Sequence, residues 1–207
     1  MPLNALSIAR ELQAMAQTGL HFSQDPYDRE RYNRLAEIAA EMLSQGSNQP
    51  VAAIREWQAA EFGYATPKVD TRAFILRDGK LLLIRENADG GKWTLPGGWA
   101  DVNECPSSAI VREVKEETGY SCRVHQLLAV WDREQHGHEP SFPFHVYKLF
   151  FHCEITGGQH QPNVESSELH FFEPGTLPEL SVSRVQARQL HWLWAKVRAR
   201  DVMTDFD

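Results

Sequence analysis

The stretch GGWADVNECPSSAIVREVKEETGY, residues 97–120, holds the most informative pattern in the chain. Pro106 suits the first turn of a helix, and Gly119 suits the position just after a helix end. The sequence therefore predicts a helix over about residues 106–118.

Three glutamates crowd one face of the predicted helix: Glu113, Glu116 and Glu117. Ile110 and Val114 form an adjoining face, so the carboxylates should line a groove beside the core rather than face open water. Like charges at these spacings repel one another, and partial burial increases that cost. A divalent cation would turn the repulsion into a binding site, because Mg²⁺ takes oxygen ligands from one or two carboxylates, water and substrate phosphates.

The residues around the glutamates fit such a site. Arg112 lies between them and can pair with Glu104, which would fix the preceding loop onto the helix. The turn at residues 96–98 contains two glycines, which allow sharp turning and close approach of the backbone because glycine has no Cβ. A carbonyl group of this turn is a candidate for a further metal ligand.

From Gly98 to Tyr120 the sequence resembles the Nudix box, GX₅EX₇REUXEEXGU, in which U is an aliphatic residue. Every fixed position matches, and the one departure is Tyr120 in place of the last aliphatic residue. The resemblance implies an α+β fold with a mixed β-sheet between helices. It also implies hydrolysis of a nucleoside diphosphate linked to a second group, X, with Mg²⁺ or Mn²⁺ as cofactor.

The resemblance also implies roles for individual residues. The metal ligands would be Glu113, Glu116, Glu117 and the Gly97 carbonyl. The catalytic residues would be Glu113, Glu116, Arg112, Glu104 and Glu165. The substrate contacts would be Arg85, Arg72, Gly98 and Glu168.

The general base and the phosphate contacts each have more than one candidate interpretation. The general base is Glu113 or Glu116 within the box, or Glu165 before the last strand. Glu168 is a second candidate there, although both residues also fit a solvated acidic loop. Arg72 and Arg85 can be phosphate contacts or simple surface cations.

The rest of the chain divides at a linker over residues 63–67. Residues 1–64 show apolar residues at helical spacing, with a first helix ending near Gly19 and a second starting at Asp25-Pro26. Residues 68–207 begin with a predicted hairpin at residues 69–86, which the acidic helix follows. Further predicted strands come next, and a helix at residues 181–200 closes the domain. We therefore expect a small all-helical N-terminal domain followed by a catalytic domain.

Residues 12–43 are similar to the helical N-terminal domain of a Nudix subgroup that contains CDP-choline pyrophosphatases and some ADP-ribose pyrophosphatases. The resemblance implies CDP-choline or another CDP-alcohol as the substrate, with ADP-ribose as the close alternative. RNA 5′-end hydrolysis, exonucleolytic activity and non-catalytic nucleotide sensing are further alternatives. The helices would serve dimerisation, substrate binding or both.

The composition restricts the partners and the compartment. The net charge of −7 over 207 residues argues against a long nucleic acid as partner. The sequence contains no run of eighteen consecutive apolar residues, so it does not predict a membrane-spanning helix. Its start lacks a secretory signal pattern. The three cysteines show no metal-ligand spacing. We therefore expect a cytoplasmic protein. The resemblance to the Nudix family implies an enzyme with a small-molecule nucleotide substrate, and the similarity of its N-terminal helices implies a homodimer.

Overall fold

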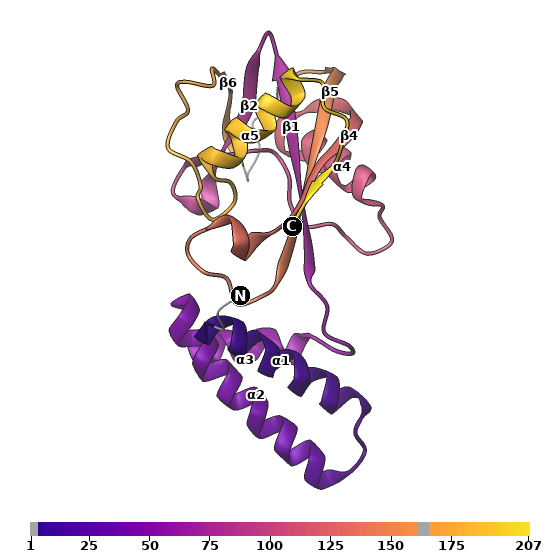
Figure 1. The fold of residues 1–207 in the computed structure, drawn as a ribbon, viewed down its shortest axis with the longest axis vertical. Coiled ribbons are helices and arrows are strands. Elements are labelled where there is room, and N and C mark those ends of the chain that lie inside the picture. Colours follow the sequence, from indigo (N-terminus) through magenta and orange to yellow (C-terminus); the bar gives the residue numbers. More distant parts are fainter. Residues whose placement is uncertain (1–3, 161–165) are drawn as a thin grey trace. The chain divides into compact units, whose positions relative to one another are not determined.

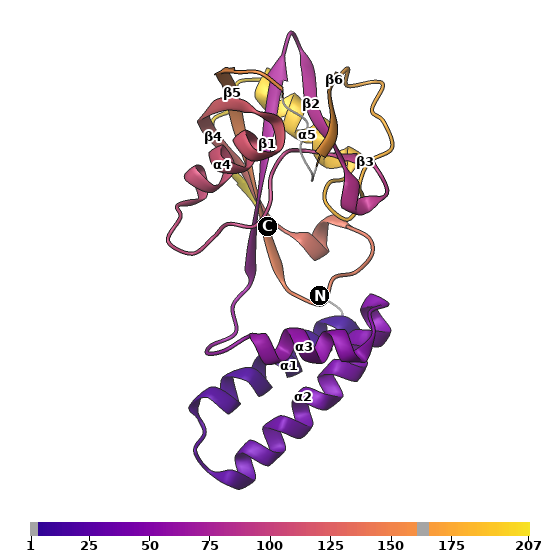
Figure 2. The same ribbon diagram turned by 180° about the vertical axis from the view of Figure 1, so that it is seen from behind.

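The computed structural model describes residues 4–160 and 166–207 of the chain. The described residues form two compact units (Figures 1 and 2). The first, here called the helical unit, comprises the residues up to Pro67 together with Glu139–His145. The second, here called the sheet unit, comprises Lys68–His138 and Val146–Asp207. Each is described by itself.

The helical unit contains α1 (Ala5–Phe22), α2 (Pro26–Ser47) and α3 (Val51–Ala60). The Asp25 carboxylate accepts hydrogen bonds from the first backbone N–H groups of α2, and Pro26 occupies its first turn. This confirms the predicted helix start. A small apolar core joins the helices and consists of Leu6, Ala9, Ala40, Leu43 and Ile54.

The predicted end of the first helix at Gly19 is wrong. Helix α1 continues to Phe22, and its last turn is closed by a hydrogen bond from the Ser23 N–H to the Gly19 carbonyl. Gly19 instead provides space, because a side chain there would overlap the ring of Tyr32 on α2. The glycine thus reflects close helix packing rather than a helix end.

Residues 139–145 belong to the helical unit through specific contacts. The Arg10 guanidinium on α1 donates to the carbonyl of Phe142. The rings of Trp57 on α3 and Phe144 pack with their centroids 5.7 Å apart. This segment, far along the chain, therefore completes the packing of the helices.

The sheet unit is built on strands that the described residues order as β3-β2-β1-β5-β4-β7, with β6 pairing with β2. The strands are β1 (Lys68–Arg77), β2 (Lys80–Glu86), β3 (Lys92–Thr94), β4 (Tyr120–Asp132), β5 (Val146–Gly158), β6 (Ser166–Phe172) and β7 (Asp205–Phe206). Strands β1 and β5 run parallel, whereas β4 and β5 are antiparallel. The sheet is mixed, as predicted.

Helices cover both faces of this sheet. Helix α4 (Pro106–Thr118) packs on one face, in a core with Ala73 and Ile75 of β1. Helix α5 (Ala187–Arg198) packs on the other, in a core with Phe74 of β1. Alternate residues of one strand thus belong to the two cores. Helix α5 lies in front of the sheet in Figure 1, and helix α4 lies in front of it in Figure 2, which is seen from behind. The predicted α+β fold is confirmed. Short 3-10 turns, η1 (Asn87–Asp89) and η2 (Arg133–His136), follow β2 and β4.

Strand β1 pairs with β5 along one edge, and along most of its other edge it contacts the loop at residues 96–98 instead of a strand. Strands β1 and β2 pair only next to their hairpin, at Leu76 and Arg77. Further back, the N–H groups of Thr71 and Ala73 donate to the carbonyls of Gly98 (2.7 Å) and Pro96 (2.8 Å). The loop before α4 is therefore held to the centre of the sheet by backbone hydrogen bonds.

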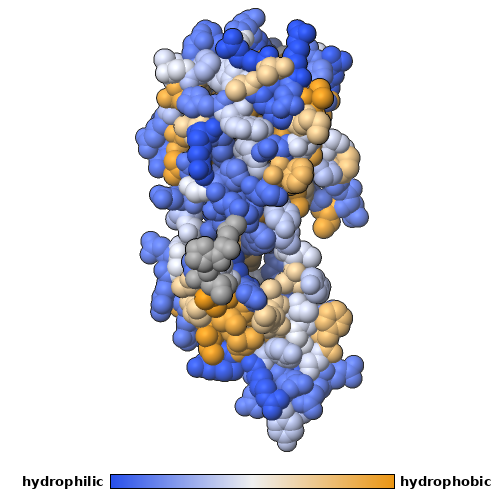
Figure 3. Space-filling view, in the orientation of Figure 1, coloured by the Kyte–Doolittle hydropathy of each residue, from blue (hydrophilic) through white to orange (hydrophobic). Residues whose placement is uncertain are grey.

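The surface differs between the units. On the face shown in Figure 3, hydrophilic residues dominate the sheet unit, and apolar residues gather in a patch on the helical unit. Large apolar side chains exposed in the helical unit are Met15, Phe22, Tyr27, Phe62 and Tyr64. Among the described residues, no helix is long and apolar enough to cross a membrane.

His138 links the segment after η2 to the α5 side of the sheet unit. Its buried ring donates from Nδ1 to the Val182 carbonyl (3.1 Å) and accepts at Nε2 from the Gln189 amide (3.2 Å). Burial, together with the charges of Lys148 and Arg133, lowers the pKa of His138 to about 3. The ring is therefore neutral in the folded protein.

We predict that His138 makes the folded protein less stable in mild acid. The unfolded chain takes up the histidine proton below about pH 6.5, whereas the folded chain does so only near pH 3, so stability is lost as the pH falls through this window. One pKa unit corresponds to about 1.4 kcal/mol, and we expect a loss of several kcal/mol. Urea unfolding from pH 7.5 to 4.5 should show a steeper loss in wild type than in His138→Gln. The exposed His191→Gln is the control, and equal slopes for all three proteins would contradict the prediction.

Candidate active site

Helix α4 forms where the sequence places it. Pro106 is in its first turn, and Gly119 ends it in the left-handed conformation, with φ of 78°. Ile110 and Val114 are fully buried against the sheet. This packing orients the glutamate face of the helix.

The three glutamates of α4 differ in burial. The Glu117 side chain is buried, that of Glu113 is only 12% exposed, and that of Glu116 is 55% exposed. The exposure of the carboxylates thus decreases from Glu116 through Glu113 to Glu117, beside the apolar face of the helix. The predicted groove beside the core fits this gradient.

Arg112 holds this group together with one guanidinium. Its Nη1 donates to Glu113 Oε1 and to Glu116 Oε2, each at 2.9 Å. Its Nε and Nη2 both donate to Glu104, at 3.0 Å. The predicted pairing of Arg112 with Glu104 is present and is bidentate, which is the stronger form of the interaction.

The turn at Gly97 and Gly98 lies against the two more buried carboxylates. The Gly97 N–H donates to Glu117 Oε2 at 2.7 Å. A side chain at Gly97 would overlap the Thr71 carbonyl, and its φ of 138° also favours glycine. A Cβ at Gly98 would lie 3.0 Å from Glu113 Oε1. Close approach of the Thr71 backbone thus requires glycine at position 97, whereas a Cβ at position 98 would need the Glu113 carboxylate to shift slightly.

The electrostatics of the carboxylates follow their surroundings. Burial raises the pKa of Glu117 to about 8, although Arg72 and the Gly97 N–H favour the charged form. Burial also raises the pKa of Glu113. The hydrogen bonds from Arg112 lower the pKa of Glu104. The ionised Glu104 therefore anchors the loop, while the inner carboxylates are costly to ionise without a nearby positive charge.

The donor set suits a hard divalent cation. It offers the oxygens of Glu113, Glu116 and Glu117 beside the turn whose Gly97 carbonyl is the predicted further ligand, and Mg²⁺ and Mn²⁺ prefer such ligands. In the described part of the chain, no three acidic, histidine or cysteine side chains converge in a preformed metal cage. Arg112 now supplies the positive charge between Glu113 and Glu116, so binding a metal there requires these carboxylates to turn from it.

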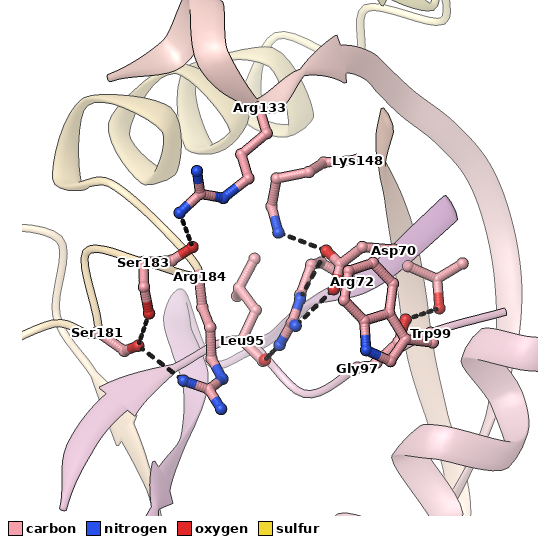
Figure 4. A network of polar contacts seen from close by, with 12 residues as sticks. Asp70, Arg72, Leu95, Gly97, Trp99, Arg133, Lys148, Ser181, Ser183 and Arg184 are labelled. Atoms are coloured by element: carbon pink, nitrogen blue, oxygen red, sulfur yellow. Dashed lines mark hydrogen bonds and ion pairs between the residues drawn. The ribbon is translucent and has the colours of Figure 1, made fainter. Parts of the chain in front are cut away.

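A buried network of charges adjoins this loop on the α5 side of the sheet (Figure 4). The Arg72 guanidinium donates twice to the Asp70 carboxylate and once to the Leu95 carbonyl, at 3.2 Å. Lys148 of β5 also donates to Asp70. Burial alone would raise the pKa of Asp70, but Arg72 and Lys148 lower it to about 2. Arg72 is therefore a buried side chain, committed to Asp70 and the loop.

The other predicted substrate residues lie elsewhere. Arg85 donates to Glu168 at 2.8 Å and to the Gly91 carbonyl at 2.9 Å. Both side chains of this pair are more than 40% exposed. Glu165, a predicted catalytic residue, lies outside the described residues. The roles of Arg85, Arg72, Glu168 and Glu165 stay predictions.

Sequence reasoning missed several charged residues around the site. Glu86, at the end of β2, influences both Arg72 and Glu117 electrostatically and pairs with Arg184 at 3.3 Å. Asp70 and Lys148 complete the buried network. Asp70 shares the alternation of Phe74 along β1 and so falls on a core-facing position. A charge in the middle of such an apolar pattern is the signal that could have found it.

The comparison with sequence families gives two matches. Residues 66–193 match the model described as "NUDIX domain". Residues 4–57 match one described as "UDP-X-like, N-terminal oligomerisation domain". The two matches fall on either side of residues 58–65.

Two individual proteins are similar along nearly the whole chain, and a third is similar along part of it. A Bacillus subtilis (strain 168) protein named "Putative ADP-ribose pyrophosphatase YjhB" is 41% identical over 202 residues, covering 98% of this chain and 96% of its own. A crystal structure titled as a UDP-X diphosphatase is 35% identical, with a TM-score of 0.64, and covers 98% of this chain and 97% of its own. The crystal structure of an ADP-ribose pyrophosphatase from Streptococcus suis 89-1591 is 37% identical, with a TM-score of 0.62, over 69% of this chain and all of its own.

We predict that Gly97→Ala disrupts the site. The added methyl group meets the Thr71 carbonyl and the Arg72 backbone, so the loop must move away from Glu117. Thermal unfolding with and without Mn²⁺ measures the effect, and the stabilisation by Mn²⁺ should largely disappear.

Gly157→Ala is the matched control for this change. Its Cβ would meet no atom within 4 Å and its φ is not in the left-handed region, so it should respond to Mn²⁺ as wild type does. An unchanged Mn²⁺ response in Gly97→Ala would argue against the loop as part of the metal site.

Proposed function

The chain belongs to the Nudix hydrolase family, and we propose that it hydrolyses the diphosphate of a nucleoside diphosphate linked to X, with ADP-ribose as the first candidate substrate. The observation that carries this proposal is the single guanidinium of Arg112, which gathers Glu104, Glu113 and Glu116 beside Gly97 and Glu117. Such a group of carboxylates can hold the cations that a diphosphate requires.

The candidate cofactor is Mg²⁺ or Mn²⁺, held by Glu113, Glu116, Glu117 and the Gly97 carbonyl. When bound, a divalent cation neutralises phosphate charge and makes a water molecule more acidic. Arg112 and Glu104 keep the loop against α4, so that the glycine turn and the carboxylates stay together. The Gly97 N–H keeps the Glu117 carboxylate turned toward the loop.

The proposed reaction breaks one phosphoanhydride bond. A water oxygen forms a new bond to one phosphorus, the bridging oxygen leaves with the other, and a carboxylate takes the water proton. The products are a nucleoside monophosphate and phospho-X. Glu113, Glu116 and Glu165 are the candidate bases, and Glu116 is the most exposed of the three α4 glutamates.

The comparisons favour ADP-ribose over CDP-choline as the first substrate to test. The relative from B. subtilis and the structure from S. suis both carry ADP-ribose in their names. The names of these relatives do not support the CDP-alcohol expected from the sequence. A UDP-linked substrate is the second candidate, because the full-length structural relative is titled a UDP-X diphosphatase.

We also propose that two copies associate through the helical unit. Residues 4–57 match a family described as an oligomerisation domain. Helix α2 presents an open groove of about 460 Å³ within this region, lined by Tyr27, Glu30, Arg31, Arg34, Leu35 and Ile38. Tyr27 is 69% exposed, and a second copy would cover it.

A hydrolysis screen tests the proposed activity. The full chain is incubated with Mg²⁺ or Mn²⁺ and ADP-ribose, UDP-glucose, CDP-choline, CDP-ethanolamine, a dinucleoside polyphosphate or a 5′-triphosphorylated RNA. We expect AMP and ribose 5-phosphate as the dominant products. In H₂¹⁸O, the product that carries the label identifies the phosphorus attacked. The absence of hydrolysis products from all six compounds would contradict the proposal.

Glu116→Gln should lower kcat by more than about 100-fold, because the change removes a charge from the proposed metal site, where even outer-shell changes cost about 10–100-fold. The fold should persist, since Glu116 is exposed. Glu179→Gln makes the same chemical change at an exposed residue that pairs with Lys92. Steady-state kinetics with the preferred substrate compare the two variants. Wild-type turnover in Glu116→Gln would remove it from the site.

Light scattering of the full chain should give twice the monomer mass of 23.6 kDa. Tyr27→Glu should shift the protein toward monomer, since it places a charge in the α2 groove. Phe22→Glu changes a similarly exposed aromatic residue outside the groove and should leave the mass unchanged. A monomeric wild type would contradict the proposed dimer, and identical masses for the two variants would move the contact away from the groove.

A further inference from the structure

Four charged side chains are buried together in the sheet unit beside the glycine loop. Asp70, Arg72, Lys148 and Arg133 are each no more than 5% exposed. Three of them are cations and one is an anion. Burying a charge is costly unless it is paired, so the pairing of these groups decides what the cluster can do.

The pairing gives Lys148 a counter-ion, Asp70, that a second cation also uses. Arg72 occupies both oxygens of Asp70, and Arg133 pairs with Glu134 at 3.0 Å. Lys148 shares Asp70 with Arg72. Among the described contacts Asp70 is its acceptor, and an ammonium group has three N–H donors. One carboxylate thus serves two buried cations.

The cluster also lies next to the reaction site. Arg72 reaches the Leu95 carbonyl, two residues before Gly97. Lys148 stands on β5, directly opposite Asp70 of the neighbouring β1. Figure 4 shows the Lys148 ammonium directed toward Asp70 and the neighbouring Arg133 guanidinium directed toward the Ser183 carbonyl. Burial, Arg72 and Arg133 lower the pKa of Lys148 to about 8, while Asp70 acts against that shift, so the two basic side chains feel each other.

We propose that Lys148 binds a phosphate oxygen of the substrate's diphosphate, with Arg133 beside it, at an anion subsite separate from the carboxylates of α4. This inference rests on the proposed function, which requires a substrate with two linked phosphates. The glutamates of α4 repel an anion and engage it only through cations. A phosphate at Lys148 would instead meet a direct N–H donor and would supply the missing negative charge. The subsite therefore orients the diphosphate from the sheet side.

The substitution that tests the subsite is Lys148→Met, which removes the charge and keeps most of the length. Lys92→Met is the matched control, because Lys92 is a more exposed lysine paired with Glu179 at 3.6 Å. The probe is inorganic pyrophosphate with Mg²⁺, and its dissociation constant is measured by calorimetry. This measurement needs no turnover and no knowledge of X.

Lys148→Met should weaken pyrophosphate binding by at least about tenfold, since a charge-assisted hydrogen bond is lost. Lys92→Met should bind as wild type does. With the preferred substrate, KM should rise in parallel while kcat changes less than about threefold. The melting temperature of Lys148→Met without ligand should not fall, because the Asp70 carboxylate keeps both of its hydrogen bonds from Arg72. Equal pyrophosphate affinity in Lys148→Met and wild type, or a large loss of ligand-free stability with unchanged affinity, would overturn the proposal.

A second variant covers a failure of Lys148→Met to fold. In wild type, the affinity for pyrophosphate should fall between about pH 7 and pH 9, because Lys148 loses its charge in this range. Lys148→Arg keeps the charge, so its affinity should not fall in this way. Identical pH profiles for Lys148→Arg and wild type would also overturn the subsite. If wild type binds pyrophosphate but hydrolyses none of the substrates tested, the proposed function fails while the subsite stands. If wild type hydrolyses its substrate and Lys148→Met binds pyrophosphate equally well, only the subsite fails.

Discussion

Carboxylates gathered beside an apolar core repel one another, and the sheet unit resolves this repulsion through Arg112. Its guanidinium reaches Glu104 on the loop and Glu113 and Glu116 on the helix. Without a positive charge there, the helix face would be destabilised by charges that burial makes worse. Arg112 thereby ties the loop to the helix, while apolar packing and backbone hydrogen bonds hold each of them to the sheet. Under the proposed function, a bound divalent cation would satisfy the same carboxylates.

The opposite side of the glycine turn carries a second set of charges with the reverse balance. Around α4 the carboxylates outnumber the cations, whereas around Asp70 the cations Arg72 and Lys148 outnumber the carboxylate. The backbone between them is held to β1 by hydrogen bonds from Thr71 and Ala73. A diphosphate bound through cations on one side and basic side chains on the other would match both. The fold thus places complementary fields on the two sides of one short loop.

The helical unit illustrates a separation between assembly and chemistry. Its core is small and consists mostly of alanine and leucine, and it leaves several large aromatic and apolar residues exposed. A unit of this size gains stability by covering such residues. The charged groups of the candidate site, by contrast, all come from the sheet unit.

The sequence alone determined those features that depend on local spacing. The ends of α4, the glutamate face, the pairing of Arg112 with Glu104 and the glycine turn all follow from residues within one stretch of the chain. The resemblance carried by this stretch also implied the α+β fold. Gly19 misled, because a glycine that admits a neighbouring ring looks like a glycine that ends a helix.

Only the tertiary structure decided which distant residues meet. Asp70 and Lys148 are far apart in the chain, and the parallel pairing of β1 and β5 sets them opposite each other. The same pairing buried Arg72, which in the sequence looked equally suited to the surface. Residues 139–145 joined the helical unit through Arg10 and Trp57. Strand register and burial depend on the whole chain, so no local pattern contains them.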